Sequence, residues 1–366
     1  MTHSPADYYT DAEVAALASR GVVVPLPGQV AIHRSVSLER IALGAVLHPF
    51  TRIAGAQTRI DAGAVIGKSG PATLEDAWVG ARAVVGDLGP VTLRETTVGP
   101  GTVLGCGVAE QAVFLGKEAT DPAFTTGYGF RVRRGSLYEE DASSAQFTDT
   151  KMTVLLPWVT LGSGLNWCDL LVSGGTGPGL GEFSEIGSGC IHFNFTPRGD
   201  KATASRIGNV VDGVFLDQPR VFIGGNASLV GPLAAPFGAV TAAGGRFTGT
   251  LQPGLNATQP EPAARGAFDL EVYGSIRRVV ASQFAYIGEL AALDAWYAHV
   301  RALLAKGDAE RADLYARGRA VVQVNLRERI AQLEALAQRM PRSAERIQRT
   351  NAADPRIAQQ RAFHEQ

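Results

Sequence analysis

Two neighbouring stretches, ATLEDAWVGARAVVG (Ala72–Gly86) and VTLRETTVGPGTVLG (Val91–Gly105), decide the fold of this chain. Val79-Gly80 in the first stretch matches Val98-Gly99 in the second, 19 residues later. A short unit repeated at a fixed length indicates a repeat architecture, because one unit cannot bury its apolar side alone and needs a stacked neighbour.

Aliphatic residues also recur every six residues along the first third of the chain. They are Ile41, Leu47 and Ile53, then Ile60 and Ile66, then Val79, Val85 and Val91. A short strand and a tight turn fit in six residues, so three such faces make a coil of ~18 residues around an aliphatic interior. We therefore predict a mainly β fold, a left-handed parallel β-helix of hexapeptide repeats. The alternative is an ordinary parallel sheet in which this spacing arises by chance.

The chain is predicted to divide into five segments. They are an N-terminal extension (1–30), β-helix coils (31–116), an inserted polar loop (117–150), β-helix coils with the candidate site (151–260) and an α-helical tail (266–366). The tail contains less glycine and more alanine, arginine, glutamate and leucine than the rest of the chain, and these four residues favour helices. Its helices are expected to break near Lys306-Gly307-Asp308 and at Pro341.

A heptad pattern within the tail predicts how its helix packs. Leu326, Ile330, Leu333, Ala337 and Met340 alternate steps of four and three. Such a seam favours packing within the domain, and a contact between subunits is the alternative.

Composition narrows the class of protein. The chain has 366 residues, a net charge of −1, 45% hydrophobic and 19% charged residues, so no global charge favours a nucleic acid or a membrane as partner. Its three cysteines have no CxxC spacing, which argues against a disulfide framework and a zinc site. The N-terminus lacks the pattern of a signal peptide, and no apolar run reaches membrane-spanning length. We expect a cytoplasmic protein.

The segment IHFNFTPRGDKAT (Ile191–Thr203) is the candidate functional site. In a strand, His192 and Asn194 share one face, and the loop that follows carries Arg198 and Lys201. His192 is the candidate catalytic base, Asn194 a candidate for orienting substrate or stabilising an oxyanion, and the two cations are candidates for binding phosphate. The alternatives are a structural histidine, an asparagine ladder and a solvated loop.

A second polar group lies upstream in SGLNWCDLL (Ser163–Leu171). Asn166 and Asp169 are candidate binding residues, because neighbouring coils bring this stretch near the first segment. Asp169 is a candidate for orienting His192, against the alternative of packing at an edge of the helix. A Cys190–His192 nucleophile pair is disfavoured, because residues two apart seldom converge.

The stretches SEIGSGCIHFNFTPRGDKATASRIG and VFLDQPRVFIGGNASLVGPLAAPFGAVTAAGGRF resemble the acetyltransferase domain of bacterial N-acetylglucosamine-1-phosphate uridyltransferases. That family carries an Ile-Gly turn, an Asn-aromatic pair, a charged loop and an Ala-Ala-Gly turn. The resemblance covers about a hundred residues and leaves out the nucleotidyltransferase domain, whose glycine-rich loop has no counterpart here. The family's catalytic histidine, one coil before the Asn-aromatic pair, also has no counterpart.

The resemblance implies an acyltransferase that takes acetyl from acetyl-CoA. It implies an amino-sugar phosphate or nucleotide-linked sugar as acceptor, and a homotrimer. It further implies that Gly225, Ala242 and Ala243 line the coenzyme through their backbone. No metal is expected.

Two other functions remain as alternatives. A non-catalytic β-helix that binds a sugar nucleotide as a sensor or scaffold is favoured by the missing histidine. A γ-class carbonic anhydrase, another left-handed β-helix enzyme, needs two histidines five residues apart, and the six histidines here have no such spacing.

Overall fold

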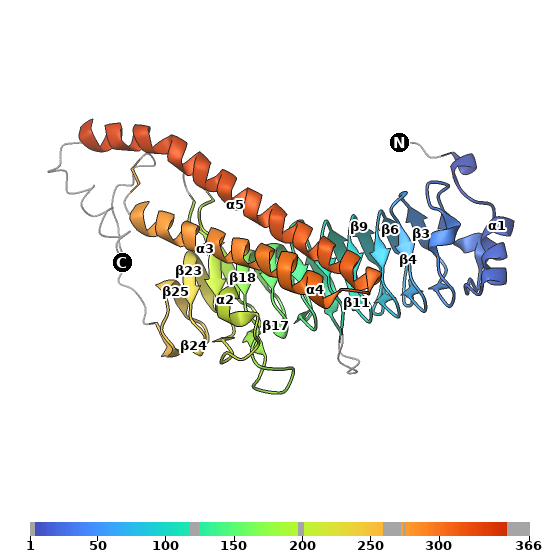
Figure 1. The fold of residues 1–366 in the computed structure, drawn as a ribbon, viewed down its shortest axis with the longest axis horizontal. Helices are drawn as coiled ribbons and strands as arrows, with labels where there is room; N and C mark the ends of the chain where they lie inside the picture. Colours follow the sequence, from blue (N-terminus) through green and yellow to red (C-terminus); the bar gives the residue numbers. More distant parts are fainter. Residues whose placement is uncertain (1–3, 118–123, 197–200, 259–271, 274–275, 350–366) are drawn as a thin grey trace.

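A computed structural model describes residues 4–117, 124–196, 201–258, 272–273 and 276–349. Its strands wind into a parallel β-solenoid of about 11 turns, as the repeat predicted. Figure 1 shows the coils stacked along the long axis of the molecule, with two long helices lying along one side.

Three walls of strands enclose the solenoid, and we name them faces A, B and C in chain order. The strands that begin on face A are β1 (Ala31–Ile32), β3 (Thr51–Ala54), β6 (Ala72–Glu75), β9 (Val91–Arg94), β16 (Asp149–Leu155), β18 (Asn166–Val172), β20 (Ile191–Asn194), β23 (Ser228–Ala235) and β25 (Arg246–Thr250). Face B has β4 (Arg59–Ile60), β7 (Trp78–Val79), β10 (Thr97–Val98), β12 (Val113–Phe114), β14 (Leu137–Tyr138) and β21 (Ser205–Ile207). Face C has β2 (Val46–Leu47), β5 (Val65–Ile66), β8 (Val84–Val85), β11 (Val103–Glu110), β13 (Thr126–Val132), β15 (Ser143–Ser144), β17 (Val159–Leu161), β19 (Ser184–Ile186), β22 (Phe222–Ile223), β24 (Ala239–Thr241) and β26 (Gly254–Asn256).

Six strands turn a corner. β16, β18, β23 and β25 continue from face A onto face B, and β11 and β13 continue from face C onto face A.

The repeat seen in the sequence is one coil of the solenoid. Leu74 pairs with Leu93 on face A, and Val79 pairs with Val98 on face B. The inward side chains stack in columns and are fully buried, so the apolar interior is continuous from coil to coil.

The N-terminal extension closes one end of this interior. It contains η1 (Pro5–Asp7), α1 (Asp11–Ala15), η2 (Ala16–Arg20) and η3 (Pro27–Gln29), and η4 (Leu38–Arg40) follows in the first coil. Val14 and Leu17 are buried in the same cluster as the coil interior. They shield apolar groups that the terminal coil would otherwise expose to water.

The segment 117–150, predicted to be an inserted loop, instead continues the solenoid, and that prediction was wrong for 124–150. β13, β14 and β15 pair in parallel with the coils on either side. The hexad pattern fails here because the inward positions carry Thr126, Ser144 and Thr150, which are fully or almost fully buried, in place of aliphatic residues. Residues 118–123 lie outside the described part.

The tail forms a helical hairpin. α3 (Ile276–Trp296) runs into a π-helical turn, η5 (Tyr297–Arg301), and α4 (Ala302–Leu304), and α5 (Ala309–Arg349) returns. The break at Gly307, which has a φ of +88°, was predicted. The break at Pro341 was not confirmed, because α5 continues through it. Pro341 is exposed near the end of α5, where the loss of one helical hydrogen bond is tolerated.

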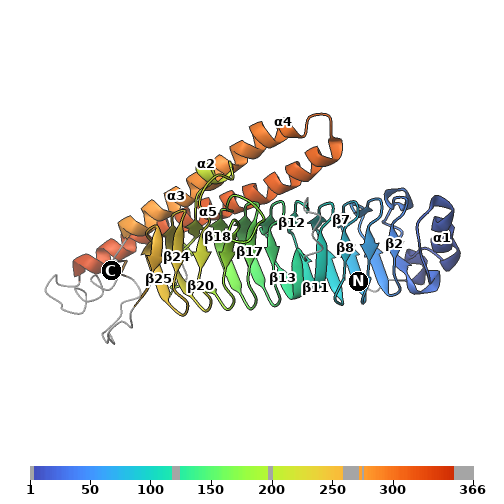
Figure 2. The same ribbon diagram turned by 90° about the horizontal axis from the view of Figure 1, so that it is seen from below.

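The hairpin covers face B, as Figure 2 shows. The outward residues of this face stack in register and form a second apolar core with the helices. From the solenoid they are Trp78, Val113, Leu137, Val154 and Leu171, and from the helices Tyr286, Leu290, Leu293, Tyr297 and Val322. Face B is therefore apolar on both sides, which explains sequence pairs such as Val113-Phe114 and Leu137-Tyr138.

The predicted heptad seam is shifted in the structure. α5 buries Val322, Asn325, Arg329 and Leu336 against the rest of the molecule, whereas Ile330 is 41% exposed. Two of these four residues are polar, so hydrophobicity alone could not identify the buried side of the helix.

A buried ionic cluster also holds the hairpin to the solenoid. Arg301 lies within 3.0 Å of Glu139 and within 2.6 Å of Glu140, and its guanidinium stacks on Tyr297 and Tyr315. The Tyr297 hydroxyl donates a hydrogen bond to Glu139. Breaking such a buried pair leaves an uncompensated charge, so this cluster ties the hairpin to one position on face B.

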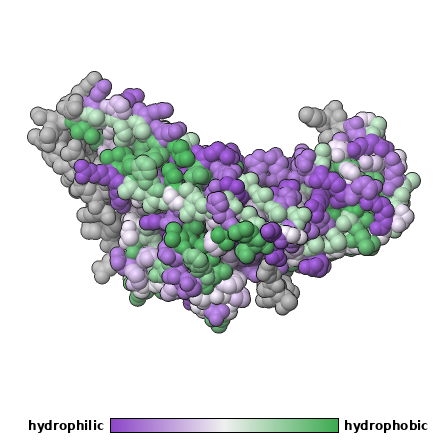
Figure 3. Space-filling view, viewed as in Figure 1, coloured by the Kyte–Doolittle hydropathy of each residue, from purple (hydrophilic) through white to green (hydrophobic). Residues whose placement is uncertain are grey.

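The hydropathy of the surface differs between the half of the solenoid that the hairpin covers and the N-terminal coils. On the side seen in Figure 3, hydrophobic residues gather over the half that carries the hairpin, and hydrophilic residues predominate over the N-terminal coils. No helix in the described part of the chain combines the length and hydropathy needed to cross a membrane.

Candidate functional site

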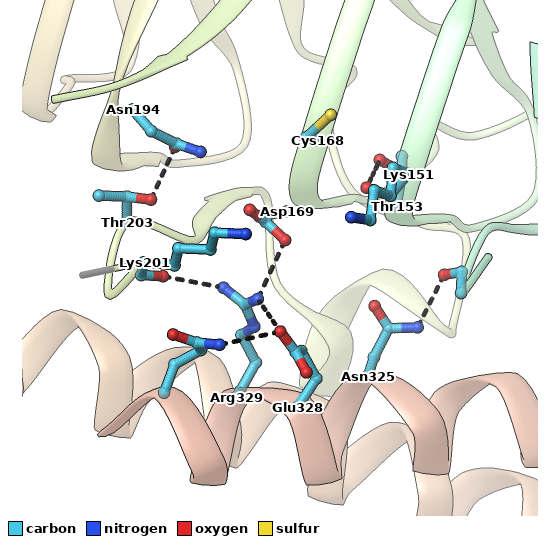
Figure 4. Close-up of polar contacts among 12 residues, drawn as sticks. Lys151, Thr153, Cys168, Asp169, Asn194, Lys201, Thr203, Asn325, Glu328 and Arg329 are labelled. Atoms are coloured by element: carbon cyan, nitrogen blue, oxygen red, sulfur yellow. Dashed lines mark hydrogen bonds and ion pairs between the residues drawn. The ribbon is translucent and has the colours of Figure 1, made fainter. Parts of the chain in front are cut away.

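Polar side chains from three neighbouring coils meet α5 at the corner between faces A and B. Figure 4 shows Asp169, Asn194 and Lys201 at this corner, with Lys151 beside them and Arg329 rising from α5 below. We call Lys151, Asp169, Asn194, Lys201 and Thr203 the corner site. Three of its members, Asp169, Asn194 and Lys201, were predicted from the sequence.

Asp169 lies where β18 bends from face A to face B. Its φ of +63° belongs to the left-handed region, which aspartate adopts more readily than most residues. The side chain is 10% exposed and pairs with Arg329 of α5 at 3.0 Å. Burial raises the pKa of Asp169, and the charges of Arg329, Lys151 and Lys201 oppose that rise.

Arg329 links α5 to both sides of the corner. Its Nη1 donates a hydrogen bond of 3.2 Å to the backbone carbonyl of Lys201, and its Nη2 bonds Asp169. The side chain is 2% exposed, so these contacts are shielded from water. Arg329 therefore holds Asp169, at the corner of β18, and Lys201, just after the charged loop, in a fixed arrangement.

Asn194 ends β20 and faces the same corner. Its Oδ1 accepts a hydrogen bond of 2.7 Å from the Thr203 hydroxyl, and Figure 4 shows its amide nitrogen turned towards the site. Gly231, in the next coil, makes room for this arrangement, because a Cβ there would collide with the Thr203 carbonyl oxygen. The side chain of Asn194 is exposed and can meet a ligand with its amide donor.

Among the residues that the structure describes, the site carries a net positive charge. The charged groups that act on Asp169 are Arg329, Lys151 and Lys201 as cations and Glu328 as a second carboxylate. Arg329 compensates Asp169 directly and lies 3.7 Å from Glu328. Three cations against two carboxylates leave the lysine ammonium groups able to attract an anion.

His192, the predicted base, points into the solenoid and not into the corner site. It is 6% exposed and stacks in register with Leu229 of the interior column. Its Nδ1 lies 2.7 Å from the Cys168 carbonyl oxygen and its Nε2 2.7 Å from the Ser205 hydroxyl. A carbonyl only accepts, so Nδ1 carries the proton and Nε2 accepts from Ser205.

Burial lowers the pKa of His192 to about 4. With both ring nitrogens engaged and the ring buried, this geometry favours a structural histidine. Asp169 does not orient His192, contrary to the prediction, because its carboxylate pairs with Arg329 on the outside of the coil.

The other predicted residues lie elsewhere. Asn166 is exposed on face A, where its Oδ1 meets the Cys168 thiol at 3.7 Å. Gly225, Ala242 and Ala243 lie at the corner between faces C and A, so the width of face A separates them from the corner site. Arg198 lies outside the described residues.

Two contributors, Lys151 and Arg329, were missed by sequence reasoning. Lys151 sits two coils before β20, where nothing in the local pattern marks it. Arg329 comes from the tail, about 130 residues after Asn194 along the chain.

Comparisons with known proteins do not assign this chain to a family. A scan against protein-family models matches none, and a search of curated proteins finds no matching relative. Among the described residues, no group of three or more His, Cys, Asp or Glu side chains is placed to hold a metal ion.

Proposed function

We propose that the corner site binds the phosphate of a phosphorylated sugar or of a nucleotide-linked sugar. The observation that supports this is the charge balance: Arg329 compensates Asp169, so the ammonium groups of Lys151 and Lys201 are left for an anion. In this proposal the chain is a binding protein, a sensor or scaffold built on a β-solenoid.

Each residue has a role in this proposal. Lys151 and Lys201 attract the phosphate, and the Asn194 amide donates to a sugar hydroxyl or to an acyl oxygen. The Asp169 carboxylate accepts from a sugar hydroxyl or amine, as carboxylates do in polar recognition. Arg329 positions Asp169 and the backbone of Lys201.

A second candidate function is acyl transfer from acetyl-CoA to the amino group of such a sugar, in a homotrimer. The observation that favours it is that Asp169 and Asn194 lie together at the corner site, where burial raises the pKa of the Asp169 carboxylate and makes it a stronger base. The amine nitrogen would attack the thioester carbonyl carbon, forming the C–N bond and breaking the C–S bond. Asp169 would take the amine proton and pass it to the departing thiolate, while Asn194 donates to the oxyanion.

Binding tests the first proposal. Isothermal titration with N-acetylglucosamine 1-phosphate and with uridine diphosphate N-acetylglucosamine should show saturable binding. Lys201→Ala should weaken it roughly tenfold, because a charge-assisted hydrogen bond is lost. Lys68→Ala is the matched control, since Lys68 pairs with Asp87 far from the site, and it should leave binding unchanged. Absence of binding by the wild-type protein would refute the proposal.

Turnover tests the second candidate. Release of thiol from acetyl-CoA is followed with glucosamine 1-phosphate as acceptor, in the wild type and in Asp169→Asn. Loss of turnover with sugar binding retained supports Asp169 as the base. Binding without any turnover in the wild type leaves the binding protein as the function.

A further inference from the structure

An exposed aromatic ring lies on face A immediately beside the corner site. Phe193 precedes Asn194 in β20 and points outward, and it is 45% exposed. It pairs in register with Val230 of the following coil, and Cys168 holds the equivalent position in the coil before, given the pairing of Asn166 with Ile191. Val230 and Cys168 are both smaller than a phenylalanine side chain, and nearly half of Phe193 is left open to solvent.

Cations line the same stripe of outward positions. Lys151 pairs in register with Cys168, which places it two coils, or about 10 Å, from Phe193 along the solenoid. Arg133 lies one coil further and is held by Asp149 at 2.6 Å, with its Nη2 3.2 Å from the Cys168 thiol. Within the described residues, no carboxylate lies within ion-pair distance of Lys151.

An exposed aromatic ring near the ammonium groups of Lys151 and Lys201 fits a nucleotide as ligand. A nucleotide presents a planar base, which stacks on an aromatic ring, joined to phosphates, which need cations. A sugar phosphate fills the phosphate position alone and has no base to place on Phe193.

We propose that Phe193 is the stacking platform for a nucleobase, whose phosphates extend along face A towards Lys151 and the corner site. This inference rests on the proposed function, because the phosphate position is shared. The base belongs either to a sugar nucleotide or to coenzyme A, and the experiment separates these two sources.

The test compares ligands with and without a base. Affinities of uridine diphosphate N-acetylglucosamine, acetyl-CoA and N-acetylglucosamine 1-phosphate are measured by titration for the wild type, Phe193→Ala and Phe193→Trp. Phe193→Ala should weaken one nucleotide ligand roughly tenfold and leave the sugar phosphate unchanged. Phe193→Trp should retain or tighten nucleotide binding. The nucleotide that responds identifies the source of the base.

Phe284→Ala is the matched control, since Phe284 is 62% exposed on α3. It should change no affinity, and thermal melting should show that all variants are folded. The inference is overturned if Phe193→Ala weakens all ligands equally or none of them. If the sugar phosphate binds and a base adds nothing to the affinity of the nucleotide ligands, only this inference fails. If no ligand binds the wild-type protein, the proposed function fails as well.

Discussion

Arg329 of α5 and Asp169 of β18 form an ion pair, with 3.0 Å between Nη2 and Oδ1, across the boundary between the helical hairpin and the solenoid. The two residues are 160 positions apart in the chain. Because Arg329 also bonds the backbone of Lys201, the helical tail is a structural part of the corner site and not an appendage to it.

Replacing Arg329 should therefore destabilise the whole molecule. Arg329→Met leaves the Asp169 carboxylate buried without its partner, and we expect a loss of about 3–5 kcal/mol in the free energy of unfolding, measured in urea. Arg319→Met is the control, since Arg319 pairs with Asp294 at a more exposed position where solvent screens the pair, and it should cost much less stability. Equal losses in the two variants would contradict the role given to Arg329.

His192 should make stability depend on pH. Its folded pKa of about 4 lies below the ordinary value of 6.5, so the neutral ring stabilises the fold above pH 6.5 and this contribution is lost as the pH falls towards 4. His192→Gln keeps a donor and an acceptor but does not titrate. The wild type should lose on the order of 3 kcal/mol more than the variant between pH 6.5 and pH 4. Parallel pH profiles of unfolding would show that His192 is not buried as a neutral ring.

The Arg301 cluster should respond to pH in the opposite direction. Burial raises the pKa of Glu139 to about 7, and Arg301 opposes that rise. In Arg301→Met the folded pKa of Glu139 climbs further, so protonation relieves the buried charge at low pH and the fold loses stability as the pH rises. The variant should be destabilised more at pH 8 than at pH 5, by urea unfolding. A loss independent of pH would mean that Glu139 is not the group affected.

The apolar contact between face B and the hairpin should carry much of the stability. Leu171→Ala removes a fully buried side chain of the second core and should cost about 2–5 kcal/mol. Leu255→Ala, at a position 74% exposed on face C, should cost less than about 0.5 kcal/mol. Equal effects would place Leu171 outside a packed core.

The solenoid was predictable because its signal is local. A repeat of 19 residues and an aliphatic every sixth residue follow from the stacking of Leu74 on Leu93, and both patterns are visible in the sequence. The pattern is lost where inward residues are polar, as at Thr126 and Ser144, so the sequence predicts an insertion where the structure has a coil.

The candidate site was predictable only in part, because half of it depends on contacts distant in the chain. Alternation predicts that His192 and Asn194 lie on one side of a strand, yet β20 ends at a corner, so Asn194 bonds Thr203 at the corner site while His192 stays in the interior. Arg329 and Lys151 reach the site only through the docking of the hairpin and the stacking of coils. No spacing along the sequence encodes these approaches.

The hairpin also changes how the solenoid can come apart. A bare stack of coils holds together through contacts between neighbours, so it can fray one coil at a time from either end. Here the two helices contact residues from Trp78 to Ala204, so the central coils are held together and should open as a single cooperative unit. The α5 residue Glu310 also pairs with Arg59 of β4, so the first coil, which contains β1 and β2, is the one that lies beyond these contacts. Amide exchange should reveal it as the first to open, under conditions where the middle of the molecule stays closed.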